Sequence, residues 1–265
     1  MNLKAIVKVM NFHAIMRVDK ANRQANRYKT LEAEVLRMID LIQNNRNLIL
    51  DKRILNPAPN GPRLRIYIGS DLGFCGAVNT SVNSMLEKET KKNTVIVIGK
   101  KIHSPVPVRL MLSRDEFEEQ YERVNKIIEE VVHSKKYSGI DICYDHFYNF
   151  SHIEPVMKTI FPIEIERDEF ESYEEDFSIE GGDVGQLMEE LVATALNYEV
   201  RVAAVVSYAA ENVLREAATN ESLKKIDEIE VQKMWEHHKE INELATNKVT
   251  DSYLKTRHRE AAKRK

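Results

Sequence analysis

The sequence contains few of the residues that interrupt helices or cross-link chains. Its 265 residues include nine glycines and seven prolines, and the long stretches 3–50 and 186–265 contain neither. The two cysteines, Cys75 and Cys143, are too few for a disulfide framework and are typical of a reducing compartment. These shortages favour a helix-rich protein over a β-sandwich, a disulfide-stabilised domain or a disordered chain.

The chain also lacks a long apolar run and a strong charge of either sign. Lys4, Lys8 and His13 interrupt the apolar residues near the beginning, so no secretory signal core is expected. The longest uncharged run of the last third, 202–210, is about half of what a membrane-spanning helix needs. A formal net charge of -3 provides no basic field for nucleic acid. We therefore expect neither a membrane-spanning segment nor a nucleic-acid partner.

The first part of the chain has the composition of one long helix. Alanine, leucine, methionine, arginine and lysine are common from Leu3 to about Leu50, and the proline-rich segment 56–62 would stop the helix. Apolar residues recur every seven positions, and a second set follows three positions later with polar gaps at Arg17 and Gln24. The first set is Val7, Ala14, Ala21, Tyr28, Val35 and Ile42, and the second is Met10, Leu31 and Met38. Such a pattern predicts a coiled-coil helix.

A second long helix is expected after Gly182, with Asp183 as its N-cap. Apolar residues then recur at helical spacing toward the C-terminus, and roughly 80 helical residues would span about 120 Å. Two interpretations are open: both ends pair lengthwise, or each folds back into a bundle, with a break possible near 219–222. The missing turn residues favour lengthwise pairing.

Between Pro62 and about Pro162, apolar strand-like runs alternate with amphipathic stretches. Strands are predicted at 66–68, 94–99, 140–144 and 156–163, and helices at 76–91 and 115–133. The alternation predicts a small, parallel-type, Rossmann-like sheet covered by helices. The acidic segment 164–180 is expected to be a solvated connector. The predicted fold class is α/β, with a long antiparallel two-helix coiled coil from the N- and C-termini plus this small domain. The predicted parts are 1–56, 62–165 and 183–265.

Glycines follow the first predicted strand, where a phosphate-binding loop would lie. Gly69, Gly73 and Gly76 have the wrong spacing for a dinucleotide loop, and Asp71 would repel a pyrophosphate. Gly99-Lys100-Lys101 resembles the end of a P-loop, but Thr94 stands where that loop needs its first glycine. Nucleotide binding by this chain is therefore not expected.

Metal binding and catalysis are equally unsupported by the residue pattern. Cys143, His146 and His152 lack an evident fourth ligand, and the adjacent His237 and His238 would point about 100° apart on a helix. No Ser/His/Asp set or carboxylate pair stands out. We assign no catalytic, cofactor-binding or metal-binding residue to this chain.

The segment 70–79, Ser-Asp-Leu-Gly-Phe-Cys-Gly-Ala-Val-Asn, carries the most specific motif. It resembles the Ser-Asp-x-Gly-Leu-Cys-Gly-x-x-Asn signature of the gamma subunit of F-type rotary ATP synthases. Segments 98–101 and 142–149 resemble further landmarks of that family in the same order, and both terminal helices align with its helices. The matching signature positions are Ser70, Asp71, Gly73, Cys75, Gly76 and Asn79.

The resemblance implies a non-catalytic central rotor shaft inside a ring of three catalytic and three non-catalytic nucleotide-binding subunits. ATP, ADP and magnesium would then belong to the partner subunits, and other stalk or membrane-sector subunits would meet the α/β domain. The complex would be cytoplasmic and peripheral to the inner face of the cell membrane. Positions carried over as partner contacts are Met10, His237, His238 and Asn242.

The chain departs from the family at these contact positions. Met-Trp-Glu-His-His at 234–238 replaces the family's Asn-Lys-Ala-Arg-Gln, and Asn242 replaces a threonine. A diverged member is therefore expected. One alternative is the shaft of a dedicated ATP-hydrolysing motor, such as the gliding-type ATPases of mycoplasmas. Outside the family, the alternative is a coiled-coil scaffold.

Overall fold

The computed structural model describes residues 3–45, 47–51, 54–55, 57–75, 78–149, 152–163, 177–179 and 182–263, with side chains described as far as Lys255. The chain forms two compact units. One comprises Asn11–Ala218, and the other comprises Met1–Met10 together with Thr219–Lys265. Gly76 and nearly all of the predicted acidic connector lie outside the described residues.

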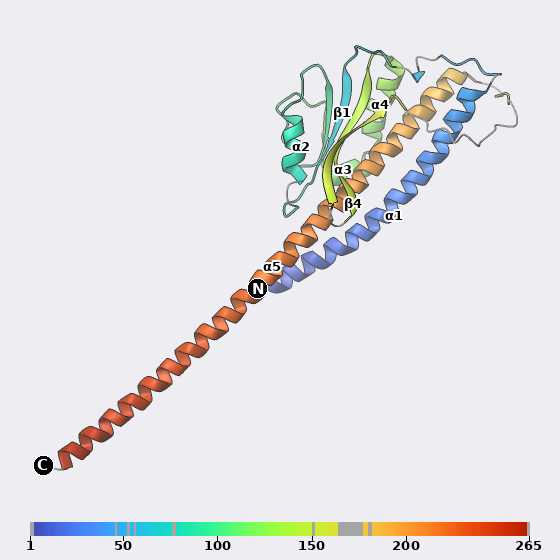
Figure 1. Ribbon diagram of the computed structural model, residues 1–265. Helices are drawn as coiled ribbons and strands as arrows, with labels where there is room; N and C mark the ends of the chain where they lie inside the picture. Colours follow the sequence, from blue (N-terminus) through green and yellow to red (C-terminus); the bar gives the residue numbers. More distant parts are fainter. Residues whose placement is uncertain are drawn as a thin grey trace. The chain divides into compact units, whose positions relative to one another are not determined.

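The unit 11–218 contains a five-stranded sheet with the strand order β3-β2-β1-β4-β5 (Figure 1). The strands are β1 (Arg63–Ile68), β2 (Thr94–Ile98), β3 (Leu110–Leu112), β4 (Gly139–Asn149) and β5 (His152–Phe161). β1, β2, β3 and β4 pair in parallel, and Ile66 lies opposite both Ile96 and Ile142. One helical crossover leads from β1 to β2 and another leads from β3 back to β4, so β2 and β4 lie on the two sides of β1.

The sheet is mixed, whereas the sequence pattern predicted a parallel one. β5 runs antiparallel to β4, with Cys143 opposite Met157. Only residues 150–151 separate these two strands, and a parallel crossover needs a dozen residues or more. The pattern also missed β3, whose three residues are too few to show a period.

Two layers of helix cover the sheet. α2 (Val78–Leu86) packs on one face, where Val82 and Leu86 join Tyr67 of β1 in a small core. α4 (Glu122–Ser134) and α5 (Val184–Lys263) pack on the other face in the larger core. The single helix predicted at 115–133 is two helices, because α3 (Arg114–Glu119) ends with Gln120 as its C-cap and α4 starts at Glu122. α3 begins at a capping box formed by Ser113 and Glu116.

The two long helices lie side by side and antiparallel within the unit 11–218 (Figure 1). Along α1 (Leu3–Asn44), Asn11 Nδ2 donates to the carbonyl of Glu216 at 3.3 Å, and the Tyr28 ring lies 6.4 Å from the Tyr198 ring. In the other unit, Lys4 Nζ lies 2.6 Å from Asp227 and 2.7 Å from Glu230. Lengthwise pairing is confirmed, and α5 continues through 219–222 without a break.

The seam of this coiled coil differs from the predicted one in its second set of residues. Leu31 and Met38 are 46% and 47% exposed. The second set lies four positions after the first, not three, and its buried members are Val18, Ala25 and Ile39. Glu32 occupies the position of this set between Ala25 and Ile39. Because it is charged, the seven-residue repeat cannot be recognised from apolar residues alone.

Each long helix has one end set by polar side chains. α1 ends at Asn44, before the expected Leu50. The side-chain Nδ2 of Asn44 donates to the backbone carbonyl of Asp40 at 3.0 Å. Asparagine side chains of this kind compete with helix hydrogen bonds. Asp183 caps α5 as predicted, since its Oδ1 accepts from the Gly185 amide at 2.8 Å.

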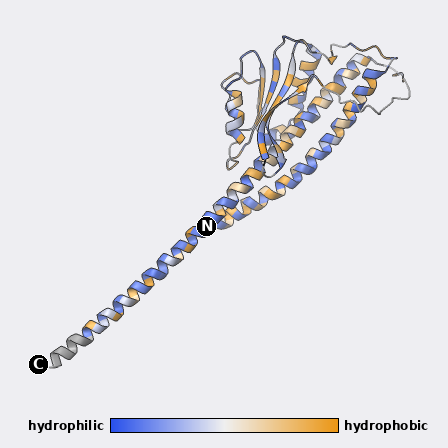
Figure 2. Ribbon diagram, in the orientation of Figure 1, coloured by the Kyte–Doolittle hydropathy of each residue, from blue (hydrophilic) through white to orange (hydrophobic). Residues whose placement is uncertain are grey.

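The character of α5 changes along its length. Apolar residues gather on its first half, and polar residues predominate toward the C-terminus (Figure 2). Its buried positions run from Met188 to Thr219, and no residue described after Thr219 is buried. Within the described part of the chain, no helix is both long and apolar enough to cross a bilayer.

Candidate functional site

The described part of the signature before α2, residues 70–75, forms a loop at the carboxyl end of β1, and Asn79 lies in α2. The Asn79 side chain stabilises this loop with two hydrogen bonds. Its Oδ1 accepts from the Ser70 backbone N–H at 3.0 Å, and its Nδ2 donates to Ser70 Oγ at 2.8 Å. Ser70 Oγ donates to the Leu72 carbonyl at 2.7 Å and lies 3.3 Å from Cys75 Sγ. Ser70 and Cys75 are buried. The Ser, Cys and Asn of the motif therefore set the loop's shape.

Asp71 joins three chain segments at this edge of the sheet. Its Oδ1 accepts from the Lys100 amide at 2.8 Å, and its Oδ2 accepts from the Arg114 amide at 3.0 Å. These amides follow β2 and β3 and are the kind of donor that a phosphate uses at such an edge. Because the carboxylate occupies both, Asp71 acts as an internal brace for this edge.

The motif's Gly73 does not require a glycine for space. A Cβ at Gly73 would meet nothing within 4 Å, and the left-handed residue of the turn is Phe74, with φ of 61°. Leu72 and Phe74 are 56% and 69% exposed. The loop therefore holds two apolar side chains outward from a hydrogen-bonded base.

A buried polar cluster on α5, formed by Glu211, Asn212 and Arg215, contacts the backbone of this loop. Arg215 Nε and Nη2 both lie 3.4 Å from the Gly73 carbonyl oxygen. Arg215 also pairs with Glu211, one helical turn earlier, and donates to Asn212 Oδ1 at 3.0 Å. All three residues are at most 4% exposed. This cluster was not predicted from the sequence, although a Glu/Arg pair at i, i+4 among apolar positions is a recognisable signal.

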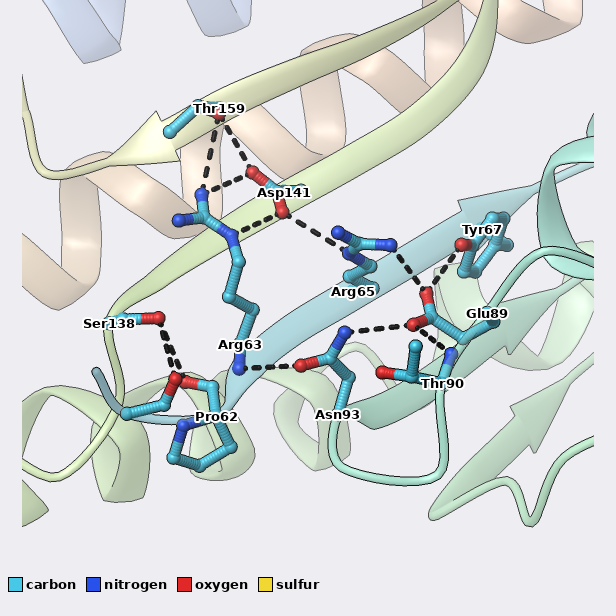
Figure 3. A network of polar contacts seen from close by, with 11 residues as sticks. Pro62, Arg63, Arg65, Tyr67, Glu89, Thr90, Asn93, Ser138, Asp141 and Thr159 are labelled. Carbon is cyan, nitrogen blue, oxygen red and sulfur yellow. Dashed lines mark hydrogen bonds and ion pairs between the residues drawn. The ribbon is translucent and has the colours of Figure 1, made fainter. Parts of the chain in front are cut away.

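The opposite edge of the sheet holds a second polar network (Figure 3). Arg63 pairs with Asp141, and Arg65 reaches Glu89, which also accepts from the Tyr67 hydroxyl at 2.7 Å. Burial opposes ionisation of Asp141, but hydrogen bonds from Arg63 and Thr159 lower its pKa overall. These contacts tie β1 to β4, β5 and the turn after α2. Their carboxylates are matched by arginines, which indicates a structural role.

The carried-over contact positions on α5, His237, His238 and Asn242, are exposed. His238 and Asn242 share one helix face with Val231, Met234 and Trp235, whereas His237 is not part of that face. Trp235 is 75% exposed and Met234 is 61% exposed. Exposed aromatic and methionine side chains at helical spacing are typical of a protein interface. Met10, on α1, is half-buried.

The residues considered as metal ligands do not converge. Cys143 faces the α2 side, where its sulfur lies 3.2 Å from that of Met85, and burial raises the pKa of its thiol to about 12. His146 lies on the other face of β4, with Nδ1 at 2.9 Å from the Tyr144 hydroxyl. Among the residues that the structure describes, no group of three or more His, Cys, Asp or Glu side chains is placed to hold a metal ion.

Comparison with known proteins gives a consistent result. A family model described as ATP synthase matches residues 1–236. The ATP synthase gamma chain of Mycoplasmoides gallisepticum is 23% identical over 169 residues, covering 59% of this chain and 58% of that one. That of Mycoplasma mobile is 32% identical over 109 residues, covering 38% of each. Both alignments thus span less than two thirds of the curated relatives.

Among solved structures, the central stalk and c-ring of the Tetrahymena thermophila mitochondrial ATP synthase contain a similar chain. The match has a TM-score of 0.55 and 16% sequence identity, and it covers 82% of this chain and 99% of that one. At this identity the likeness concerns the fold.

Proposed function

This chain belongs to the ATP synthase family as a gamma-type, central-stalk member, and from that premise we propose that it is the non-catalytic shaft of an F-type rotary ATPase. The observation that carries the proposal is the family match over 1–236, on a chain whose terminal helices pair antiparallel. The shaft couples ATP hydrolysis or synthesis in surrounding subunits to rotation.

The proposed partners are a ring of three catalytic and three non-catalytic nucleotide-binding subunits, with one shaft per ring. ATP, ADP and magnesium bind to the ring and not to this chain. The α/β domain meets other stalk or membrane-sector subunits. The assembly is peripheral to the inner face of the cell membrane, on the cytoplasmic side.

The mechanism needs shape and no reactive group. A single chain lacks three-fold symmetry, so it presents different side chains to each of three equivalent catalytic subunits. Differential contact is sufficient to give those subunits different nucleotide affinities, and rotation exchanges the affinities in turn. The exposed face containing Trp235, His238 and Asn242 is the proposed contact.

The two alternatives are less well supported. A scaffold outside the family does not account for the match over 1–236. A dedicated hydrolysing motor shares the fold, but the matched relatives bear the name ATP synthase gamma chain.

Purification of the native complex through an affinity tag on this chain tests the proposal. We expect native mass spectrometry to show three copies of each of two nucleotide-binding subunits per copy of this chain. Several copies of this chain per complex, or a complex without nucleotide-binding subunits, would support the scaffold. ATP synthesis driven by a proton gradient in reconstituted vesicles distinguishes the synthase from a dedicated hydrolysing motor.

A further inference from the structure

A cavity of about 180 Å³ lies within the unit 11–218, between α1, α3, α5 and Tyr121 of the segment that joins α3 to α4. Two arginines line it, Arg114 from α3 and Arg201 from α5, together with Tyr28 and Tyr121. Glu118 is the only acidic side chain among the lining residues. The lining therefore carries an excess of positive charge.

The flat face of the Arg201 guanidinium group stacks on tyrosine rings, and none of the described residues accepts a hydrogen bond from the N–H groups at its edge. Its Cζ lies 3.7 Å from the centre of the Tyr121 ring and 5.6 Å from that of Tyr28. Stacking of this kind fixes the guanidinium plane while its five N–H donors point outward in that plane. Within the described residues, Arg201 makes no hydrogen bond or ion pair in addition to this stacking.

Arg114 is also stacked and lacks a carboxylate partner. It lies 3.6 Å over the Tyr208 ring, and Nη2 donates to the Ala204 carbonyl at 3.2 Å. Burial lowers the pKa of Arg114, while Glu211, Glu118 and Asp71 oppose the shift by longer-range attraction. None of the described carboxylates forms an ion pair with this guanidinium, and Glu211 is already paired with Arg215.

We propose that this cavity is a binding site for one small oxyanion, such as inorganic phosphate or sulfate. The planar N–H edges of two arginines match the geometry of oxyanion oxygens, and partly buried charges such as these two are stabilised by an ion of opposite sign. Gln24 Nε2 donates to the Tyr28 hydroxyl at 3.2 Å, which leaves the hydroxyl hydrogen able to donate to the anion. The volume is below the roughly 300 Å³ of sites for larger ligands, which favours a single anion over a nucleotide.

The oxyanion could be free or could belong to a nucleotide, and titration of the full chain distinguishes these sources. Isothermal titration calorimetry would be run with phosphate, sulfate and ADP at constant ionic strength, and thermal unfolding would be followed in parallel. We expect saturable 1:1 binding of phosphate and sulfate, no binding of ADP, and a higher unfolding temperature with phosphate than with chloride. Binding of ADP alone, or equal stabilisation by chloride, would overturn the proposal.

Variants connect the binding to the cavity. Arg201→Gln should weaken phosphate binding at least tenfold, and Arg201→Lys should weaken it less. The matched control is Arg123→Gln, which removes the same charge from an exposed position on α4 that does not line the cavity. Glu118→Gln removes the acidic side chain from the lining and should tighten phosphate binding several-fold. Because Glu118 is exposed, this variant provides a second test if the Arg201 variants do not fold. Unchanged affinity in Arg201→Gln or in Glu118→Gln would refute the assignment.

Discussion

The carboxyl groups of Glu32 on α1 and Glu199 on α5 face each other across the coiled-coil seam, close enough to share a proton. Two carboxylates in contact cannot both be charged without strong repulsion, so one of them holds a proton. Lys158 of β5 pairs with Glu199 at 2.6 Å, which makes Glu199 the ionised partner. Burial and the bond to Glu199 raise the pKa of Glu32 to about 8. Burial opposes ionisation of Glu199, but bonds from Glu32 and Lys158 lower its pKa overall.

This pair predicts a pH dependence of stability with a definite sign. The folded-state pKa of Glu32 lies above its unfolded value of 4.5, so the folded state binds more protons between about pH 4.5 and 8. The contribution of Glu32 to stability is therefore complete below pH 4.5 and is lost as the pH rises through about 8. Glu199, whose pKa is lowered, contributes above its unfolded value and loses that contribution in acid. Glu32→Gln should flatten the decline, as measured by urea unfolding of the full chain at pH 5–9.

Two lysines near Glu32 affect the size of this pH dependence, and an exposed glutamate on α1 provides the control. Lys29 and Lys158 lower the pKa of Glu32 by attraction, so they narrow the window but do not reverse its sign. Glu34→Gln removes an exposed carboxylate from the same helix and should leave the pH profile unchanged. A Glu32→Gln profile parallel to that of the unaltered chain would contradict the shared proton.

A glycine outside the signature should be less replaceable than one inside it. Gly99 has φ of 124°, and a Cβ there would lie 2.8 Å from the carbonyl carbon of Gly69. Gly99→Ala should lower the free energy of unfolding by at least about 1 kcal/mol. Gly73→Ala, into open space at an ordinary φ, should change it by no more than about 0.5 kcal/mol. Equal losses of unfolding free energy in the two variants would contradict this difference between Gly99 and Gly73.

Arg215 should be necessary because it neutralises a buried acid. Arg215→Met leaves Glu211, which is 4% exposed, without its arginine, and a broken buried ion pair costs about 3–5 kcal/mol. The double variant Glu211→Met/Arg215→Met should recover much of this loss, because neither charge then remains. Thermal and urea unfolding of both variants measure the difference. A double variant less stable than the single one would contradict this explanation.

Trp235 should contribute to assembly and not to folding. Its side chain is 75% exposed, so Trp235→Ala should leave the unfolding midpoint of the isolated chain unchanged. Loss of a central aromatic side chain typically costs about 2–4 kcal/mol of binding, so retention of ring subunits in the native complex should fall sharply. Lys233→Ala, exposed on the same helix but not on the face with Trp235, is the matched control. Full retention by Trp235→Ala would exclude this face as the contact.

Much of the fold could be predicted because it is encoded locally. The absence of glycine and proline in 186–265 and the N-cap at Asp183 predicted α5, and the apolar runs predicted β1, β2, β4 and β5. The antiparallel direction of β5 was missed because strand direction depends on the connection, and β3 was missed because three residues show no period.

The candidate site could be located but not explained from the sequence. The motif identified the loop at 70–79, but its pattern could not show that Asn79 and Asp71 brace it or that Gly73 is replaceable. Those roles depend on hydrogen bonds to Ser70 and Lys100, which the fold brings within reach.

The sequence by itself determined where most of the helices and strands lie, because backbone propensity, capping and apolar period act between near neighbours. Only the tertiary structure decided which charged and polar groups meet: Glu32 with Glu199, Arg215 with the Gly73 carbonyl, and two arginines around one cavity. Each of these contacts joins residues from distant parts of the chain. Their energies depend on burial and on partner distance, which exist only after the helices have packed against the sheet.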